Sequence, residues 1–450
     1  MKYGSLISKI QGLSKGGIVR DPNSFSFITQ YPPPLTLNKI SNFKFKRRAI
    51  ELYIHIPFCT GKCAYCKFFS FCVKDKKVIQ NYLGNLEKEL KIYLKKSDLK
   101  DRVIDSIYLG GGTPSILRID QIKWLMRLIR KNLRVSKNVE ITIESSPETL
   151  TAKKLFSYLE YGINRISIGV QDFNDDILRF VMRRHTGKMA IEAIEKARKA
   201  GFKKINIDLI YGLPRQTINH WKNNLSIISK LRPEYITIYH LRREKGTVIA
   251  TLKKSEFPSK EEIIKMYLEG LNRLKELGYI QIAPDQFASP GNIFEQQENK
   301  WKVGKELIGL GASGYSFFNG FVYYNARSIK DYSKLVQEGK LPVWLGKEVS
   351  AKELMRRTLI FGLKTSGINR EDSGLDKKMF EERFGITVES FFGVELERLR
   401  KLGLIKDDGN FIKLSLTGLV LSEEVCRELY SPEIKTQLDK IGDKFGRGGL

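Results

Sequence analysis

The residues best suited to chemistry are three cysteines in the spacing C-x-x-x-C-x-x-C, namely Cys59, Cys63 and Cys66. They directly follow residues 50–56, a run rich in β-branched and aromatic side chains that predicts a buried strand. Iron–sulfur clusters are bound by cysteine thiolates at short local spacings, and a [4Fe–4S] cluster normally takes four of them. Three cysteines would leave one iron open to a substrate or a cofactor.

A zinc site and plain structural cysteines are the alternatives to a cluster. Structural zinc sites use four ligands, commonly as two separated pairs. The only histidine near the array, His55, precedes it within the expected strand. A disulfide requires an oxidising compartment and is typical of small scaffolds, which a chain of 450 residues is not. The spacing therefore favours a cluster bound by reduced thiolates.

Strands and helices alternate between about residue 49 and residue 320. The expected strands are 50–56, 103–109, 139–144, 165–170, 204–210 and 235–241. Apolar residues recur at helical spacing in 77–94, 120–132, 188–200 and 218–230. This alternation predicts an α/β fold of parallel β/α units, and six strands indicate a partial (β/α)6 barrel rather than a closed eightfold one. In such folds the functional residues lie at the carboxyl ends of the strands.

Polar residues and glycines recur at that end. The run Gly110 to Thr113 follows the second strand, where glycines let backbone groups approach a ligand closely. Glu144 ends the third strand, Gln171 follows the fourth, Asp208 lies near the end of the fifth, and His240 lies near the end of the sixth. Each has an ordinary alternative as a cap, an ion-pair partner or a loop residue. Their convergence on one edge predicts a binding site there.

The pattern divides the chain into an N-terminal extension over residues 1–48, a barrel over 49–320 and a C-terminal domain over 321–450. In the extension, Tyr31-Pro32-Pro33-Pro34 indicates a polyproline-like segment. In the C-terminal domain, helices are expected over 352–364 and 388–402, a hairpin over 404–414, and a last helix that Thr417 caps and that ends near Tyr430. Helices followed by a hairpin indicate a winged-helix-like α+β domain, which either reads DNA or packs over a large substrate.

Composition limits the classes of function. With 42% hydrophobic and 28% charged residues, and no apolar run long enough to span a bilayer, we expect a cytoplasmic protein. The formal net charge of +28 suits nucleic acid, an anionic membrane surface or a substrate with several carboxylates. Lysine is spread through nearly every expected helix, and only residues 44–48 form a compact basic cluster. Solvated helix faces therefore explain most of the charge, and nucleic-acid binding is not favoured.

The cysteine spacing resembles that of the radical S-adenosylmethionine (SAM) superfamily, in which the open iron binds SAM. Residues 53–58 before the array and Tyr65 within it are similar to the oxygen-independent coproporphyrinogen III oxidase family, which includes heme chaperones and a class of methyltransferases. The similarity covers most of residues 50–430. It implies a partial barrel with a winged-helix-like C-terminal domain, a [4Fe–4S] cluster held by Cys59, Cys63 and Cys66, and one or two SAM molecules.

The resemblance also implies which residues contact SAM: Tyr53, Tyr65, Gly111, Gly112, Thr113, Glu144, Gln171, Arg183 and Asp208. Arg183, two residues before His185, could pair with a SAM carboxylate through parallel hydrogen bonds, which lysine cannot form. Residues 309–316 resemble a late glycine-rich turn of the family that closes the SAM site.

The implied activity is reductive cleavage of SAM to methionine and a 5′-deoxyadenosyl radical, which abstracts a hydrogen atom from the substrate. In the oxidases the outcome is oxidative decarboxylation of coproporphyrinogen III. The implied partners are a tetrapyrrole or another large anionic compound, and an electron donor such as flavodoxin or ferredoxin.

The chain departs from the family at two places. Phe68 stands where the oxidases usually carry a fourth cysteine, and residues 296–301 keep only the tryptophan of the chaperones' His-Asn-x-x-Tyr-Trp segment. A methyltransferase that uses a pair of SAM molecules and a heme chaperone therefore stay open beside the oxidase.

Overall fold

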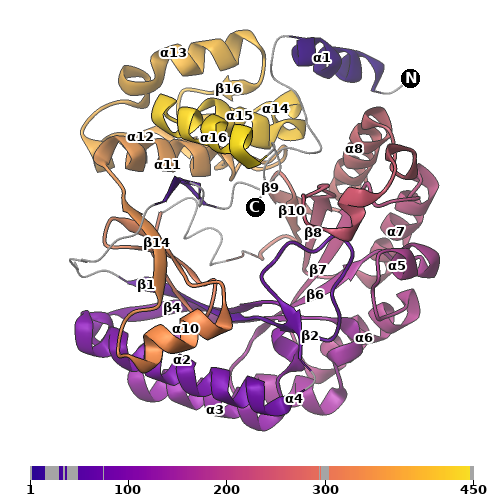
Figure 1. Ribbon diagram of the computed structural model, residues 1–450. Helices are drawn as coiled ribbons and strands as arrows, with labels where there is room; N and C mark the ends of the chain where they lie inside the picture. The colour runs from indigo at the N-terminus through magenta and orange to yellow at the C-terminus, as the bar shows by residue number, and fades with distance from the viewer. Residues whose placement is uncertain are drawn as a thin grey trace. The chain divides into compact units, whose positions relative to one another are not determined.

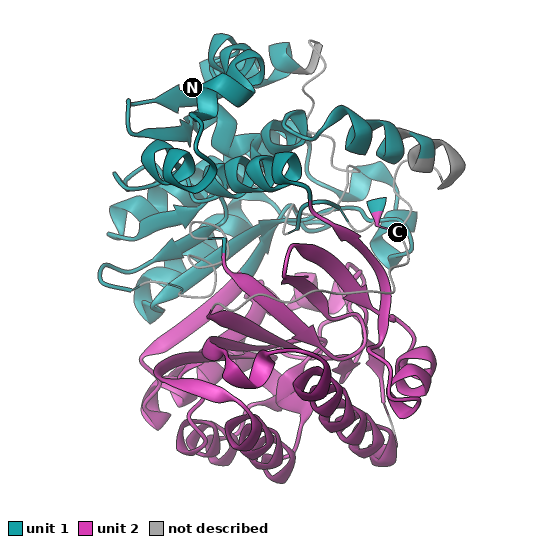
Figure 2. Cartoon of the chain, turned by 90° about the vertical axis from the view of Figure 1, so that its left-hand side faces the viewer, with its two compact units in different colours: residues 1–36, 209–304, 350–450 teal, residues 37–208, 305–349 magenta. Residues whose placement is uncertain are grey.

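The computed structural model describes residues 3–15, 30–33, 36–37, 49–73, 75–292, 294 and 304–445. The chain forms two compact units, coloured separately in Figure 2. Unit 1 comprises Met1–Thr36, Leu209–Gly304 and Ser350–Leu450, and unit 2 comprises Leu37–Asp208 and Lys305–Val349. Each unit is therefore assembled from segments that are far apart in the sequence.

The centre of unit 2 is a parallel sheet with β1 (Ile50–Ile56) in its middle. On one side of β1 follow β4 (Val103–Gly111), β5 (Arg134–Ser145), β6 (Arg165–Gln171) and the first residues of β7 (Lys204–Tyr211). On its other side, β11 (Glu306–Leu310) pairs with β1 in parallel. Side chains on both faces of β1 are buried, which explains why most of its residues are apolar. The expected strands in this sheet are confirmed, although β5 begins earlier than its apolar part indicates.

Helices of unit 2 lie along the outer side of these strands in Figure 1. They are α2 (Lys76–Lys96), α3 (Ile119–Asn132), α4 (Ala152–Glu160), α5 (Asp175–Phe180) and α6 (Gly187–Ala200), with single turns η2 (Leu99–Asp101), η3 (Pro114–Ile116) and η4 (Pro147–Thr149). Side chains of Asp75, Thr151, Asn174 and Thr186 cap four of the helices by accepting hydrogen bonds from backbone N–H groups of the first turn. The helices expected from periodicity are confirmed.

Beyond β11 the sheet of unit 2 becomes antiparallel. The chain continues through β12 (Tyr315–Phe318), β13 (Phe321–Asn325), α10 (Ile329–Gln337) and β14 (Val343–Glu348). The glycine-rich turn between β11 and β12 fits closely: a Cβ at Gly309 would collide with the Tyr315 carbonyl, and Gly311 has a φ of +94°. Sequence periodicity did not indicate this extension.

A buried carboxylate on α2 holds that turn. Glu89 accepts hydrogen bonds from the Gly311 N–H (2.8 Å), the Asn325 amide (2.7 Å) and the Tyr332 hydroxyl (2.7 Å). Tyr82, also on α2, accepts from the Ala312 N–H and donates to the carbonyl of His55 at the end of β1. Burial raises the pKa of Glu89 to about 7, against the opposing effect of these donors.

Unit 1 contains the end of β7 followed by β8 (Tyr235–His240), β10 (Gln286–Ala288) and β9 (Ile280–Ala283) in sheet order. Strands β8, β10 and β9 pair antiparallel. Helices α7 (Ile218–Leu231) and α8 (Lys260–Glu276) pack against one another, and the single turns η5 (Val248–Thr251) and η6 (Lys254–Glu256) precede α8. The sixth expected strand is thus present as β8.

The C-terminal part of unit 1 has the expected winged-helix-like arrangement. Helices α11 (Ala351–Leu363), α12 (Lys377–Phe384) and α13 (Val388–Lys401) accompany a small sheet of β15 (Leu375–Asp376), β17 (Phe411–Leu414) and β16 (Ile405–Asp407). The hairpin β16–β17 turns at Gly409, which has a φ of +93°. Helix α1 (Gly4–Lys15) also belongs to this unit.

The expected last helix from Thr417 to Tyr430 is wrong in detail. Ser415, not Thr417, caps α14 (Leu416–Val420) by accepting from the Gly418 N–H. The chain leaves helical geometry at Leu421, and α15 (Ser422–Glu428) and α16 (Pro432–Phe445) follow as separate helices. Pro432 begins α16, a position where proline is favoured because no N–H is needed.

The described part of the polyproline-like segment is anchored within unit 1. Tyr31 is fully buried, donates from its hydroxyl to Glu353, and accepts from the Ser431 N–H (3.3 Å). The Arg357 guanidinium donates to the Tyr31 carbonyl (2.7 Å). Pro34 and the basic residues 44–48 lie outside the described residues. Among the residues that the structure describes, no helix is both long and apolar enough to cross a membrane.

The first testable consequence concerns Glu89. Because its pKa is about 7 in the folded protein and near 4.5 when exposed, the folded state binds an extra proton between these values. The stabilisation is complete below pH 4.5 and is lost as pH rises through 7. We expect the advantage in unfolding free energy of wild type over Glu89→Gln to shrink by up to about 3 kcal/mol between pH 5 and pH 8.

Urea unfolding at both pH values measures this difference. Gln cannot titrate, so the substitution separates Glu89 from all other ionisable groups. An advantage that stays constant or grows with pH would show that folding does not raise the pKa of Glu89.

Candidate functional site

The cysteine array lies on a closed loop at the carboxyl end of β1. Short strands β2 (Phe58–Cys59) and β3 (Phe71–Cys72) pair in parallel and bring the ends of the loop together. Within the loop, the Lys62 ammonium donates to the Phe68 carbonyl (2.6 Å) and the Ser70 hydroxyl (2.9 Å). The Ala64 N–H donates to the Val181 carbonyl (3.0 Å), which joins this loop to the segment that carries Arg183.

The three sulfurs of the array are close enough for the charge of one to affect another, and they are not crosslinked. All five cysteines of the chain are free. Burial raises the pKa of Cys59 and of Cys66; the charges of Cys66 and Cys63 raise that of Cys59 further, and the charge of Cys63 raises that of Cys66. Cys59 Sγ accepts from the Thr113 hydroxyl (3.6 Å), and Cys63 Sγ accepts from the Arg183 guanidinium (3.5 Å). Three neighbouring thiols on one loop, two of them with hydrogen-bond donors beside them, suit an iron–sulfur cluster with one open iron.

His55 is unsuited to bind zinc. Its Nε2 donates to the Phe69 carbonyl (3.0 Å), so its Nδ1 accepts from the Tyr53 hydroxyl (3.0 Å). Burial lowers the pKa of His55 to about 4, so the ring is neutral. Both nitrogens therefore hold the cysteine loop and the strand together. Within the described residues, no three His, Cys, Asp or Glu side chains gather as a site for a single metal ion.

The glycine run after β4 lies directly against the cysteine loop. The Gly112 N–H donates to the Ile56 carbonyl (2.9 Å), and the Thr113 N–H donates to the Phe58 carbonyl (2.7 Å). A Cβ at Gly112 would lie 2.6 Å from the Phe58 oxygen and 2.9 Å from Cys59 Sγ. Gly111 has a φ of +117°, and a Cβ there would meet the His55 ring. Only glycine allows this close approach.

Glu144, the penultimate residue of β5, binds the same glycine run. It accepts from the Gly111 N–H (3.0 Å) and from the Tyr108 hydroxyl (2.8 Å). Burial raises its pKa to about 7 against the opposing effect of these donors, and the nearby charge of Asp208 raises it further. Tyr53 stacks on Tyr108. The structure thus brings Tyr53, Gly111 and Glu144 together, as expected for one site.

Arg183 is held by four groups. Its guanidinium donates to Cys63 Sγ (3.5 Å), the Ser146 hydroxyl (3.0 Å), the Gly169 carbonyl and His185 Nδ1 (3.3 Å). Since Nδ1 accepts, His185 donates from Nε2 to the Val170 carbonyl (3.1 Å). Burial also raises the pKa of Tyr65, which lies within electrostatic range of Arg183. Arg183 therefore joins the cysteine loop to the ends of β5 and β6.

Sequence reasoning missed Glu148 as part of this site. Glu148 accepts from the hydroxyls of Thr60 (2.9 Å) in the cysteine loop and Ser146, and lies 3.7 Å from His185. Burial alone would raise its pKa, but the contacts with His185 and Ser146 and the charge of Arg183 outweigh burial and lower it to about 2. The one sequence feature that could have indicated Glu148 is its position just after the third expected strand.

Gln171 and Asp208 lie on the neighbouring strands. Gln171 ends β6 with a φ of +70°, a conformation rare for residues other than glycine. Asp208 lies inside β7, not at its end, and accepts from the Ser167 hydroxyl (3.0 Å) and the Asn206 amide (2.9 Å). These hydrogen bonds are also what we expect if Asp208 has an ordinary structural role, which is the alternative given in the sequence analysis.

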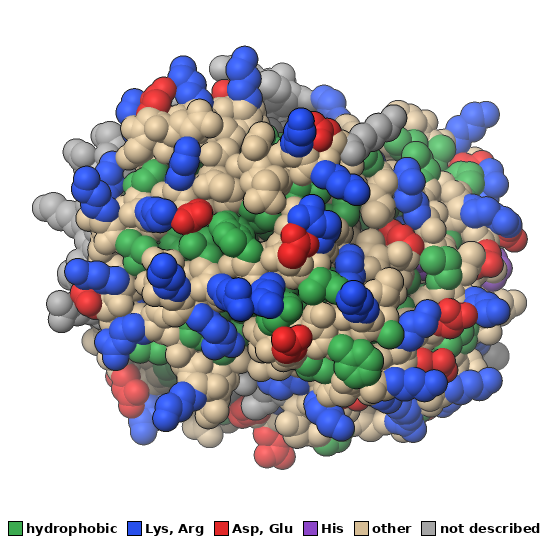
Figure 3. Space-filling model, turned by 90° about the horizontal axis from the view of Figure 1, so that it is seen from below, with side chains coloured by type: hydrophobic (Ala, Val, Ile, Leu, Met, Phe, Trp, Pro, Cys, Tyr) green, Lys and Arg blue, Asp and Glu red, His purple; other side chains and the backbone are tan. Residues whose placement is uncertain are grey.

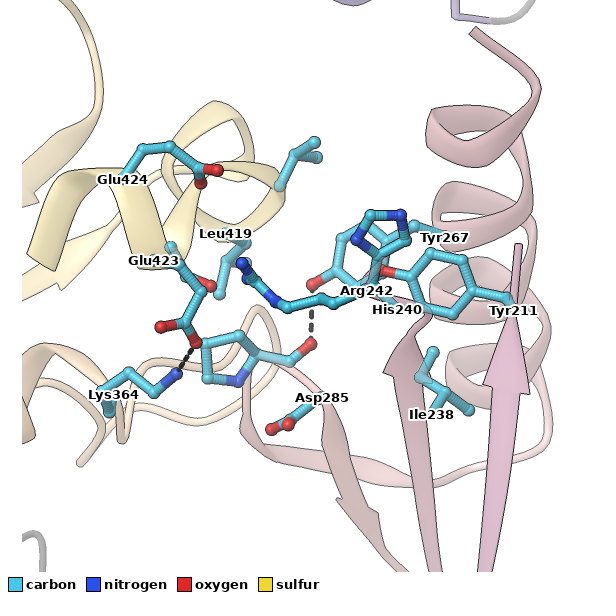
Figure 4. A pocket seen from close by; sticks show the side chains of 13 residues that line it. Tyr211, Ile238, His240, Arg242, Tyr267, Asp285, Lys364, Leu419, Glu423 and Glu424 are labelled. Atoms are coloured by element: carbon cyan, nitrogen blue, oxygen red, sulfur yellow. Dashed lines mark hydrogen bonds and ion pairs between the residues drawn. The ribbon is translucent and has the colours of Figure 1, made fainter. Parts of the chain in front are cut away.

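His240, the last residue of β8, lines a cavity of about 30 Å³ within unit 1 (Figure 4). Tyr211, Arg242 and Asp285 line it too, and Figure 4 shows the buried ion pair between Lys364 and Glu423 at its edge. This volume holds about one water molecule. The cavity is therefore too small for a cofactor or a tetrapyrrole.

The close fit of Gly112 gives a prediction. In Gly112→Ala the new methyl group must displace the Phe58 backbone or Cys59, and such overpacking costs about 1–3 kcal/mol. We expect the affinity for the cluster to fall by about tenfold or more. Iron and sulfide bound per chain after anaerobic reconstitution measure the effect. Gly84→Ala on α2 is the control, since a Cβ there meets nothing within 4 Å. Equal iron content in both variants would contradict the prediction.

Comparisons with known proteins agree with this geometry. The family described as "Radical SAM superfamily" matches residues 53–227, and the "HemN C-terminal domain" matches residues 349–421. The heme chaperone HemW of Bacillus subtilis is 32% identical, over 83% of this chain and 97% of the relative. The oxygen-independent coproporphyrinogen III oxidase of Escherichia coli is 27% identical over 90% of each chain.

Among solved structures, coproporphyrinogen III oxidase (HemN) from Escherichia coli, described as a radical SAM enzyme, matches with a TM-score of 0.79. The two chains are 27% identical, and the match covers 90% of this chain and 96% of the Escherichia coli chain. The predicted fold class and the predicted resemblance are thereby confirmed. The chain belongs to the radical SAM superfamily, in the group that contains the HemW heme chaperones and the oxygen-independent coproporphyrinogen III oxidases, and its cofactors are a [4Fe–4S] cluster and SAM.

Proposed function

We propose that this protein is an enzyme that cleaves SAM reductively and acts on a tetrapyrrole, with coproporphyrinogen III as the first candidate substrate. The observation that carries the proposal is the convergence of the three cysteines, the glycine run, Glu144 and Arg183 at one end of the strands of unit 2. When bound, the cluster and SAM supply an electron and a 5′-deoxyadenosyl radical that abstracts a hydrogen atom from the substrate.

The chain's own residues have separate roles in this proposal. Cys59, Cys63 and Cys66 hold the cluster. Arg183 pairs with the SAM carboxylate, because a guanidinium can offer two parallel donors to a carboxylate. The remaining contacts to one or two SAM molecules come from Tyr53, Tyr65, Gly111, Gly112, Thr113, Glu144, Gln171 and Asp208.

Charge and kinship support a tetrapyrrole substrate. The relatives are named for coproporphyrinogen III and for heme, both of which are tetrapyrroles. The formal net charge of +28 suits a substrate with several carboxylates. Figure 3 shows Lys and Arg side chains spread over the face seen from below, with acidic and apolar side chains between them. This distribution gives no support to a nucleic-acid site on that face.

A heme chaperone is the second candidate. The identity to HemW of Bacillus subtilis, 32%, exceeds the 27% identity to the Escherichia coli oxidase. Phe68 also occupies the place of the fourth cysteine that the oxidases usually carry. The segment 296–301, which bears on the chaperone alternative, lies outside the described residues.

The deciding experiment is anaerobic. The protein is reconstituted with iron and sulfide, reduced with dithionite, and incubated with SAM alone, with SAM and coproporphyrinogen III, and with heme. Mass spectrometry follows 5′-deoxyadenosine, porphyrin products and methylated species. We expect 5′-deoxyadenosine together with decarboxylated porphyrinogen.

Substitution of one ligand tests the cluster. Cys63→Ala should remove both the visible absorbance of the cluster and the formation of 5′-deoxyadenosine. Cys72→Ala is the control, because Cys72 is an exposed thiol just after the same loop and should be dispensable. Normal SAM cleavage by Cys63→Ala would contradict the assignment of Cys63 as a cluster ligand.

The remaining outcomes separate the candidates. Stoichiometric and stable heme binding, with the porphyrinogen unchanged, would replace the oxidase by the chaperone. Methylated products would indicate a methyltransferase. Absence of 5′-deoxyadenosine in every mixture that contains reduced cluster would refute SAM cleavage altogether.

A further inference from the structure

Two large apolar side chains are exposed beside the cysteine array. Phe68 is 73% exposed and lies in the cysteine loop, two residues after Cys66. Met182 is 51% exposed and directly precedes Arg183. Met182 has a φ of +62°, a backbone conformation that L-residues rarely adopt and that is often retained for function.

Hydrogen bonds and close packing join the two segments that carry these side chains. The Ala64 N–H donates to the Val181 carbonyl (3.0 Å), one residue before Met182. A Cβ at Gly61 would collide with the Arg184 guanidinium, so Arg184 lies over the cysteine loop. Lys62 donates to the Phe68 carbonyl (2.6 Å). The segments that carry Phe68 and Met182 are therefore held against each other within unit 2.

The rim of this surface is basic. Lys62 and Arg184 are exposed, whereas the nearby carboxylates are engaged. Glu148 binds Thr60 and Ser146, and Asp176 pairs with Arg179. Exposed apolar side chains surrounded by like charges are typical of a protein-binding surface, and cations select an acidic partner.

The same surface lies over the cysteines. Each of Cys59, Cys63 and Cys66 is partly exposed, and Arg183, next to Met182, donates to Cys63 Sγ (3.5 Å). A bound cluster would thus lie close under this surface. Electron transfer between proteins weakens steeply with distance, so a donor must dock where the cluster is nearest to solvent.

We propose that Phe68, Met182, Lys62 and Arg184 form an electron-entry face that docks an acidic one-electron carrier protein, with a flavodoxin as the representative. This inference rests on the proposed cluster function. In the step, the reduced flavodoxin is oxidised by one electron and the cluster is reduced by one electron. No atom or group passes between the two proteins.

The experiment uses the reconstituted holoprotein and fully reduced flavodoxin. Anaerobic stopped-flow absorbance follows the bleaching of the cluster, and titration calorimetry with oxidised flavodoxin measures binding. For Phe68→Glu and for Met182→Glu we expect the second-order rate constant for cluster reduction and the affinity to fall by about tenfold. The two substitutions lie on different segments, so loss of one variant leaves the other as a test.

Charge and shape are separated by a further variant. Phe68→Lys removes the same ring as Phe68→Glu but keeps the rim basic, and it should slow reduction less. Both the wild-type rate and the wild-type affinity should fall as salt is added. Equal effects of Lys and Glu at this position would refute the role of charge.

A matched control exists on the outer helix α4. Phe156 is 57% exposed in the same unit, and Phe156→Glu makes the same chemical change away from the cysteine loop. It should leave flavodoxin-dependent reduction unchanged. An equal loss in Phe156→Glu and Phe68→Glu would show a general effect of net charge and overturn the proposal.

Dithionite distinguishes failure of docking from failure of the proposed function. This small reductant needs no docking face, so Phe68→Glu and Met182→Glu should cleave SAM with dithionite at the wild-type rate. Unchanged flavodoxin kinetics in both variants would refute the electron-entry face while leaving the enzyme intact. A raised KM for porphyrinogen with dithionite would reassign the surface to the substrate and also refute docking. If dithionite yields no cleavage even in wild type, the proposed function fails, yet the calorimetry still decides whether the face binds flavodoxin.

Discussion

The candidate site depends on the parallel pairing of β1 with β4. This register sets Ile56 beside Gly111, so that the glycine run and the cysteine loop leave the sheet side by side. The backbone hydrogen bonds from Gly112 and Thr113 to the ends of β1 and β2 then fix the loop at a distance that excludes any larger side chain. Every other contact of the site, from Glu144 to Arg183, is added to this frame.

Three carboxylates in unit 2 show how the same side chain acquires different properties. Glu89 and Glu144 receive hydrogen bonds mainly from neutral donors, and burial raises the pKa of each to about 7. Glu148 lies near His185 and Arg183 and receives the Ser146 hydroxyl, and its pKa falls to about 2. The difference comes from the contacts of Glu148 with His185 and Ser146, followed by the charge of Arg183, which together outweigh the desolvation of Glu148. Around neutral pH, Glu148 is therefore ionised, whereas Glu89 and Glu144 are close to the pH at which they gain or lose a proton.

The sequence allowed the parallel strands to be predicted because strands buried on both faces are rich in β-branched and aromatic residues, as β1 is. The cysteines, the glycine run and Glu144 could be identified because each lies at or just after the carboxyl end of such a strand. The contacts of Glu148 with Thr60 and His185 could not be predicted, because they join residues far apart in the sequence. The strands β12 to β14 and the break at Leu421 were missed for a related reason: tertiary packing, not local periodicity, decides them.

The pairing of β1 with β11 has a consequence for how the protein is made. Ile50 lies beside Glu306, so the strand that leads into the cysteine loop gains its second neighbour only after most of the chain has left the ribosome. Contacts of such high sequence separation form slowly. Until then the late turn cannot pack against the carbonyl of His55, and the strand before the cysteine loop lacks one of its two neighbours. The frame of the candidate site is therefore completed only in the last stages of synthesis and folding.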